Sequence, residues 1–274
     1  MSDIILIIGA PRSGTTLLSG LITGNTECYP NLPECTFITQ IIQHYYNIVH
    51  YSDKERFRVY ANSEQELKKT YIANVANMIS IVLNQFKDHT YKHLIFKDPE
   101  LTSYIDLIPD FFGNSSKIVY IIRDPREVVA SMLTVMLKKQ RQDSYLELIF
   151  PFIKRLRNDE LTKIITDQIF NYYFIAHTSK IYKNQKLCIV RYENIIKKEE
   201  TEFLKLEDFL GYKIGRKAFE RNYFSFDKDD PTFSKNYGKD IIEVKSDFRD
   251  KLSKKSIKLI EETFSGYNTR YKWW

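Results

Sequence analysis

The sequence IILIIGAPRSGTTLLSGLI, at residues 4–22, carries the strongest indication of the fold. It begins with five apolar residues, a run typical of a strand that is covered on both faces of its sheet. A loop with glycines at positions 9 and 14 follows, and it opens a segment in which leucine and isoleucine recur at helical spacing. The main-chain N–H groups of such a loop, with the positive end of the helix behind it, form a binding site for an anion. The stretch therefore predicts a strand, an anion-binding loop and a helix in succession.

Similar apolar runs recur along the chain, at His93–Phe96, Lys117–Ile122 and Leu187–Val190. Long helical patterns separate them, one of which opens with a capping box of Ser63 and Glu66. Strands that alternate with helices need crossover connections, and these produce a parallel sheet. We therefore expect an α/β protein, a three-layer α/β/α sandwich with a central parallel sheet and a P-loop-like nucleotide-binding fold. Ligands should bind at the carboxyl ends of the strands.

The bulk composition bounds the class of protein. The 274 residues carry 43% hydrophobic and 28% charged side chains, show no linker or repeat, and predict one domain over residues 1–274. The net charge of +6 is mild and its lysines are scattered, which favours a small anionic ligand over nucleic acid. The three cysteines lack the spacing of a metal site, and no apolar stretch is long enough for a membrane span or a signal peptide. We expect a cytoplasmic protein with no metal and no membrane partner.

The first loop departs from the nucleoside-triphosphate version of its pattern. That version has a lysine before the Ser/Thr, where it reaches the β- and γ-phosphates, whereas this chain has Thr15 there and its cation earlier, at Arg12. A kinase would lack its central charge. The group that an adenosine phosphosulfate transfers carries less charge, so an arginine fork and two hydroxyls suit it without a magnesium bridge. The alternative is an ordinary strand-to-helix turn in which the glycines only permit the bend.

The residues GAPRSGTTLL resemble the 5′-phosphosulfate loop of sulfotransferases that depend on 3′-phosphoadenosine 5′-phosphosulfate (PAPS). The arginine form is similar to that of tyrosylprotein sulfotransferases and many bacterial carbohydrate sulfotransferases. The resemblance implies PAPS as donor and its desulfated form, PAP, as product. It implies nucleotide binding by the loop residues Arg12, Ser13, Gly14, Thr15 and Thr16.

A second loop follows the predicted strand Lys117–Ile122. Pro125 suits the first helical position and Asp124 the N-cap, with Glu127 as the partner of a capping box, so Asp124 has a structural explanation. The spacing of Arg123 and Ser131 resembles the site for the 3′-phosphate in the family, and an arginine with a hydroxyl is a suitable receptor for that dianion. The alternatives are a surface ion pair for the arginine and a solvated hydroxyl for the serine.

Two further segments extend the resemblance. In LCIVRYENII, Tyr192 is expected either to line the adenosine pocket or to pack as a half-buried tyrosine. The later stretch FSKNYGKDIIEVKSDFRDKL has the composition of a mobile loop over the nucleotide. There Ser234 and Lys245 have a spacing similar to the serine and lysine of the tyrosylprotein group, with a plain solvated loop as the alternative. The final helix, around 247–264, and the aromatic chain end are expected to pack against the body.

Transfer to an alcohol needs a base and cations near the transferring group. Steroid and phenol sulfotransferases have a histidine after the central strand, but this chain reads FKDPEL there, with Pro99 at that position. The KDP sequence resembles the tyrosylprotein enzymes instead. That resemblance implies Lys97 as a second catalytic cation beside the loop arginine and Glu34 as the base, with Asp98 and Glu100 in reserve. Partial desolvation after Pro33 would raise the pKa of Glu34, whereas the alternative is an acid that complements a helix dipole.

These residues together predict an enzyme that transfers the sulfuryl group of PAPS to a hydroxyl. The main alternatives are a small-molecule kinase of the phosphate-loop class and a PAP-binding module without catalysis. The aromatic-rich regions 37–88 and 140–182 should form the acceptor pocket. We expect the acceptor to be a carbohydrate or a small secondary metabolite. The oligomeric state is left open.

Overall fold

The computed structural model of the chain describes residues 3–51, 58–140, 151–184, 186–218, 221 and 247–274, and for 139–140 and 151–157 the backbone alone. Within these ranges the strands form one parallel sheet with the order β2-β1-β3-β4. The strands are β1 (Asp3–Gly9), β2 (His93–Lys97), β3 (Lys117–Ile122) and β4 (Leu187–Arg191). All four lie where the apolar runs predicted them.

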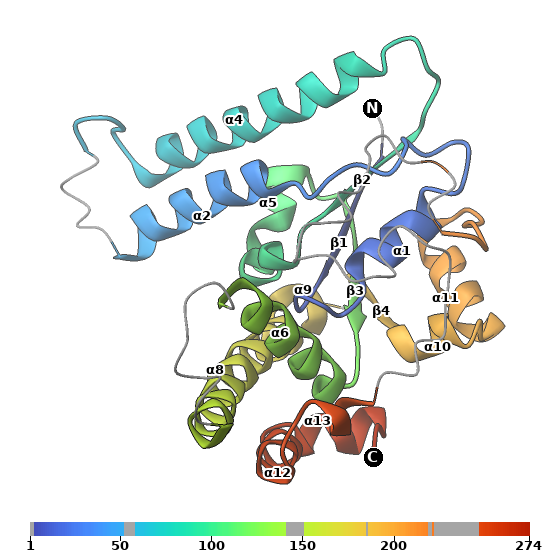
Figure 1. Ribbon diagram of the computed structural model, residues 1–274. Coiled ribbons are helices and arrows are strands. Elements are labelled where there is room, and N and C mark those ends of the chain that lie inside the picture. Colours follow the sequence, from blue (N-terminus) through green and yellow to red (C-terminus); the bar gives the residue numbers. More distant parts are fainter. Residues whose placement is uncertain (1–2, 52–57, 141–150, 185, 219–220, 222–246) are drawn as a thin grey trace.

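Side chains that alternate along the strands build a separate core on each face of the sheet. Leu6 and Ile8 of β1 belong to the larger core, whereas Ile5 and Ile7 belong to the smaller one, and all four are fully buried. Figure 1 shows helices on both faces of the sheet. The three-layer α/β/α sandwich is therefore confirmed, and nearly uniform apolarity of the strands follows from burial on both sides.

The smaller core is covered by α1 (Thr15–Ile22), α10 (Tyr192–Ile196) and α11 (Glu200–Leu210). The helices over the larger core are α2 (Thr36–Tyr51), α4 (Glu64–Gln85), η1 (Pro99–Leu107), α5 (Ile108–Phe112), α6 (Pro125–Gln140), α8 (Pro151–Thr178) and α9 (Lys180–Lys183). Helices α2 and α4 lie alongside each other at one end of the molecule (Figure 1). None of the helices described is long and apolar enough to cross a bilayer.

The N-terminus of α4 differs slightly from the predicted capping box. Ser63 Oγ accepts the Glu66 N–H at 3.1 Å, as expected. The Glu66 carboxylate returns to the N–H of Asn62 at 2.9 Å rather than to Ser63. The side chain of Ser63 therefore caps the helix as predicted, but the carboxylate of Glu66 bonds to the residue before the predicted one.

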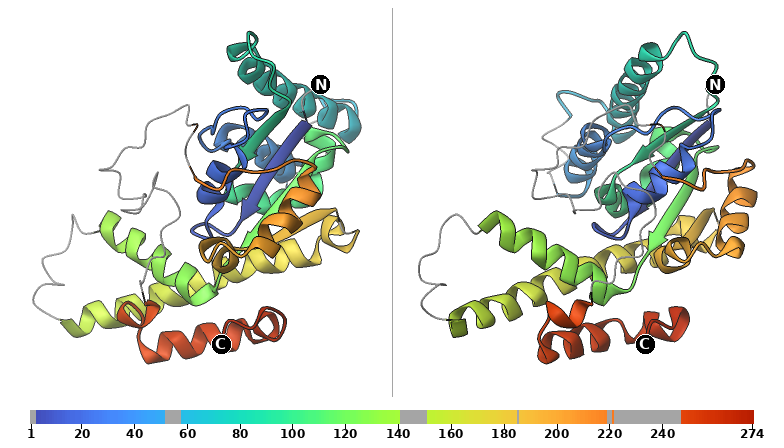
Figure 2. Two further views of the ribbon diagram at one scale, coloured as in Figure 1. Left: turned by 90° about the vertical axis from the view of Figure 1, so that its right-hand side faces the viewer. Right: turned by 45° about the vertical axis from the view of Figure 1, so that its right-hand side comes forward.

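The C-terminal segment packs beside α6 and α8, as Figure 2 shows in red. It contains η2 (Phe248–Asp250), α12 (Lys254–Thr263) and α13 (Ser265–Tyr271), so the predicted final helix is divided. Ser253 caps α12 by accepting the N–H of Ser256 at 3.1 Å, which explains why a helix begins afresh there. The chain end packs against the body as expected, with Tyr271 buried.

The sheet order determines where a ligand can bind. From β1 the chain moves to β2 on one side, whereas from β3 it moves to β4 on the other. The loops after β1 and β3 diverge at this point, and in open parallel sheets ligands bind in such a switch point at the carboxyl ends of the strands. The loop after β1 and the loop after β3 are the two that the sequence assigned to an anion.

Candidate active site

The first loop is a tight turn that ends in an open helix terminus. The N–H of Ser13 donates to the carbonyl of Ala10 at 3.0 Å, and Arg12 has a φ of 72°, as the third residue of a type II turn does. Gly14 is the N-cap of α1, makes no side-chain cap and is followed by no acid in the first turn. The first N–H groups of a helix have no partner within it, so the terminus of α1 has the geometry of an anion site.

The glycines of this loop make room for neighbouring protein groups. A Cβ on Gly9 would lie 2.6 Å from the carbonyl oxygen of Ile121. A Cβ on Gly14, where φ is 108°, would lie 2.5 Å from the ring of Tyr192. Tyr192 therefore covers the loop directly, which is consistent with both of its predicted roles. Ser13, within the loop, and Thr15, the first residue of α1, are buried.

The second loop touches the first. Arg123 Nη1 donates to the main-chain carbonyl of Arg12 at 3.2 Å, and its guanidinium lies 4.3 Å from the centre of the Tyr192 ring. Arg12 Nε donates to Ser131 Oγ at 3.2 Å. The structure thus brings together the residues predicted for the 5′ and 3′ ends of the nucleotide. Ser131 is half-buried and engaged, so the solvated hydroxyl is not its role here.

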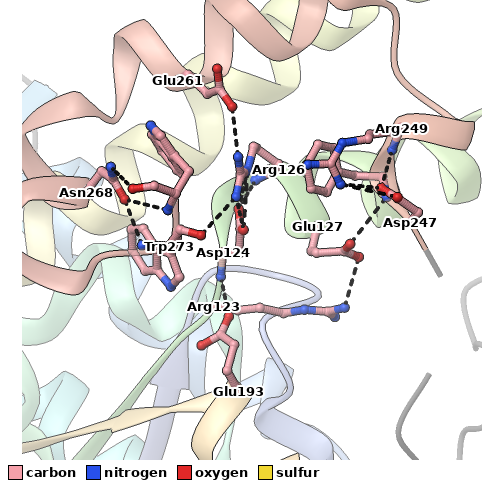
Figure 3. Close-up of polar contacts among 12 residues, drawn as sticks. Arg123, Asp124, Arg126, Glu127, Glu193, Asp247, Arg249, Glu261, Asn268 and Trp273 are labelled. Carbon is pink, nitrogen blue, oxygen red and sulfur yellow. Dashed lines mark hydrogen bonds and ion pairs between the residues drawn. The ribbon is translucent and has the colours of Figure 1, made fainter. Parts of the chain in front are cut away.

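The N-terminus of α6 is closed by its own side chains (Figure 3). Asp124 Oδ1 accepts the Arg126 N–H at 2.9 Å, which confirms the N-cap. The predicted capping box is wrong, because the N–H of Asp124 donates to Glu193 at 2.6 Å instead of to Glu127. Burial raises the pKa of Glu193, and its contact with the main chain of Asp124 is structural.

Arg126 ties this terminus to the C-terminal segment. Its guanidinium is paired with Asp124 at 2.7 Å and with Glu261 of α12 at 2.8 Å, and it donates to the carbonyl of Trp273 at 3.2 Å. The rings of Phe248 and Trp274 lie 4.6 and 4.4 Å from it. Burial opposes the charged form, but the carboxylates of Asp124 and Glu261 outweigh it and raise the pKa of Arg126. The aromatic chain end is held in place by this cation.

Lys97 occupies the centre of the site at the carboxyl end of β2. Its side chain is 1% exposed, and Nζ donates to Thr16 Oγ1 and to Glu34 Oε1, both at 3.0 Å. The N–H of Cys35 donates to the carbonyl of Lys97 at 3.0 Å, which holds the loop that carries Glu34 against the strand. A buried ammonium thus joins the first loop to the carboxylate, so Lys97 is not a surface lysine at the end of its strand.

Glu34 is more open than the sequence suggested. Its side chain retains 44% exposure, so the expected desolvation is not found. It precedes α2 by two residues and binds Lys97 rather than the helix terminus.

The two reserve carboxylates have other partners. Asp98 is buried, burial raises its pKa, and Oδ1 caps η1 by accepting the Glu100 N–H at 3.0 Å. Glu100 accepts the hydroxyl of Tyr172 at 2.7 Å. The geometry therefore favours Glu34 as the group that meets an acceptor.

Glu127 does not have its predicted role as the capping partner at the N-terminus of α6. Its Oε2 lies 3.4 Å from Arg123 Nη2, and its Oε1 accepts the N–H of Phe248 at 3.3 Å (Figure 3). Burial raises the pKa of Glu127, and the charge of Arg123 opposes this rise. The i, i+4 spacing from Arg123 was the available signal. Ser234 and Lys245 lie outside the described residues.

A phosphate-type loop and a second cationic loop at the switch point of a parallel sheet are typical of a nucleotide-binding protein. A family model described as "Sulfotransferase family" matches residues 4–215. The chain therefore belongs to the sulfotransferase family. This confirms the enzyme class expected from the sequence, a PAPS-dependent sulfotransferase.

Solved structures agree on the fold. Sulfotransferase STF9 from Mycobacterium avium is 10% identical with a TM-score of 0.55, and the match covers 98% of this chain and 76% of that one. Mouse sulfotransferase SULT7A1, solved in complex with PAP, is 13% identical with a TM-score of 0.53 over 97% of this chain and 85% of that one. No curated protein sequence matches the chain significantly.

Proposed function

We propose that this sulfotransferase transfers the sulfuryl group of PAPS to a hydroxyl of a carbohydrate or a small secondary metabolite. The observation that carries the proposal is the position of Lys97 Nζ, 3.0 Å from both the hydroxyl of Thr16 and the carboxylate of Glu34. One buried cation thereby links the donor loop to a base that is open to an acceptor. We also propose a single domain over residues 1–274 and retain a cytoplasmic location as a prediction from composition.

The donor set of the site suits a bisphosphorylated adenosine. The open terminus of α1 and Arg12 offer N–H groups to a 5′-phosphosulfate, while Arg123 and Ser131 offer a fork and a hydroxyl to a 3′-phosphate. Tyr192 lies between the two loops, where a ring can contact the adenosine. When bound, PAPS supplies an activated sulfuryl group. Its desulfated form occupies the related fold of mouse SULT7A1.

The residues divide the work of transfer between them. Glu34 accepts the proton of the acceptor hydroxyl, because it is the exposed carboxylate beside the donor loop. Lys97 and Arg12 stabilise the negative charge that develops on the transferring and leaving oxygens. Since Lys97 is buried, its charge acts through a less polar medium than water and interacts more strongly.

The acceptor region is proposed from its position. Helix α2 begins two residues after Glu34 and carries Phe37, which is 78% exposed and three residues along the chain from the base. Tyr104 and Tyr172 supply further aromatic surface near Glu100. Such walls suit the face of a sugar or of a polar natural product.

Thermal shift and turnover measurements test this function. PAP should raise the melting temperature of the purified protein, whereas ATP with magnesium should not. A screen with labelled PAPS over sugars and polar natural products should then identify an acceptor. Stabilisation by ATP with magnesium would indicate a kinase instead. Stabilisation by PAP with no turnover of any acceptor would indicate a binding module.

A further inference from the structure

Arg12 occupies a backbone position that usually belongs to glycine. Its φ of 72° is left-handed, and the turn from Ala10 to Ser13 places it third, after Pro11. A residue with a side chain is strained there, by roughly 1 to 2 kcal/mol. Such strain persists only where surrounding groups fix the conformation.

Side chains from the second loop and from α6, the helix that follows it, hold this turn. Arg123 Nη1 donates to the carbonyl of Arg12, while the N–H of Ser13, at the other end of the same peptide unit, donates to Ala10. Because a peptide unit is planar, fixing both ends fixes its orientation. The fixed peptide unit in turn orients the N–H groups that follow it, at the start of α1. Ser131 holds the side chain of Arg12 in addition.

Arg123 is itself fixed on three sides. The Tyr192 ring stacks against its guanidinium at 4.3 Å, and Glu127 lies 3.4 Å from Nη2. Glu127 is held in turn by the N–H of Phe248, so the C-terminal segment contributes to the arrangement (Figure 3). A guanidinium with directed bonds to Arg12 and Glu127 acts as a brace, which a flexible ammonium would not reproduce.

We propose that Arg123 is a positioning residue for the first loop, in addition to the 3′-phosphate contact that the proposed function gives it. Recognition of the 5′ end of the nucleotide then depends on Arg123 even when the nucleotide has no 3′-phosphate. A residue that served only the 3′-phosphate would leave such a nucleotide unaffected. This inference rests on the proposed function.

Calorimetric or competition titration with PAP and with adenosine 5′-monophosphate separates the two roles. Arg123→Ala should weaken binding of the 5′-monophosphate about tenfold, because a charge-assisted hydrogen bond to the loop is lost. Arg123→Lys keeps the charge but not the fork, and should also weaken it, by about fivefold. Arg270→Ala removes the same charge from an exposed position on α13 and should change neither affinity.

The outcomes distinguish the inference from the function on which it rests. If both Arg123 variants lose PAP affinity but bind the 5′-monophosphate as the parent protein does, Arg123 is only a phosphate receptor and the inference is wrong. Loss of 5′-monophosphate binding in Arg123→Ala alone would show a charge effect and also overturn it. A parent protein that binds PAP no better than the 5′-monophosphate would contradict the proposed function itself.

Discussion

The loops after β1 and β3 are neighbours with the same strand–loop–helix order, yet the N-termini of the helices that follow them are capped differently. Helix α1 begins at Gly14 with no side-chain cap and no acid in its first turn. Helix α6 begins at Pro125, and Asp124 accepts a main-chain N–H of its first turn. A main-chain N–H that the N-cap carboxylate already accepts is not offered to an anion, and Pro125 has no N–H at all. The first loop can therefore bind with its main chain, whereas the second must bind with side chains.

The loop after β2 is followed by a helix that is capped in the same way as α6. Asp98 and Pro99 open η1 as Asp124 and Pro125 open α6, with the aspartate again accepting an N–H two residues on. In both cases the cation lies immediately before the aspartate, as Lys97 and as Arg123. In both loops an Asp-Pro pair caps the N-terminus of the helix, and the cationic side chain before it lies at the site.

Loss of the cations should have the largest effect. Lys97→Ala and Arg12→Ala should each lower kcat by a hundredfold or more, since an oxyanion donor contributes roughly 2.7 to 4 kcal/mol to the transition state. Steady-state turnover of PAPS at saturating acceptor measures this. Lys92→Ala, at an exposed lysine paired with Glu27 just before β2, should retain full activity. Unchanged turnover in both site variants would remove them from the mechanism.

Removal of the closed cap should affect stability rather than chemistry. Asp124→Ala eliminates the N-cap and one partner of the buried Arg126, and should lower the free energy of unfolding by about 2 kcal/mol. Urea denaturation measures this loss. Asp247→Ala removes the exposed cap of η2 and should cost clearly less. Equal losses in the two variants would mean that burial of the α6 cap does not matter.

The open loop should be sensitive to a single methyl group. Gly14→Ala must place a Cβ 2.5 Å from the Tyr192 ring, whereas at Gly211, whose backbone is left-handed like that of Gly14, the nearest atom is Lys117 Nζ at 3.7 Å. Gly211→Ala should cost about 1 kcal/mol for its left-handed backbone, and Gly14→Ala about 1 kcal/mol more. Gly14→Ala should in addition weaken PAP binding. Equal unfolding energies for the two variants would contradict the contact with Tyr192.

The smallest effect separates the backbone of Arg12 from its side chain. Arg12→Gly and Arg12→Ala both lack the guanidinium, but only glycine adopts a φ of 72° without strain. Arg12→Gly should therefore be more stable than Arg12→Ala by about 1 kcal/mol in urea denaturation. An alanine variant as stable as the glycine variant would show that the loop relaxes once the side chain is gone.

Much of the sheet, and of the loops at its carboxyl edge, followed from local sequence. Strands buried on both faces are uniformly apolar, and the carboxyl ends of parallel strands meet at one edge, so the loops that carry Arg12 and Arg123 were expected there. The position of Lys97 beside Arg12 came from the resemblance of the KDP sequence to the tyrosylprotein enzymes. The N-caps at Ser63 and Asp124 were equally predictable, because a cap involves residues only two or three apart.

The distant groups that complete these local features became known from the three-dimensional structure alone. The N–H of Asp124 is satisfied by Glu193, far along the chain, and Glu127 is shared between Arg123 and Phe248. The brace of Arg12 by Arg123 likewise joins loops from two strands. Hydrogen bonds between residues far apart in sequence depend on the path of the chain in three dimensions, and local sequence propensities do not specify that path.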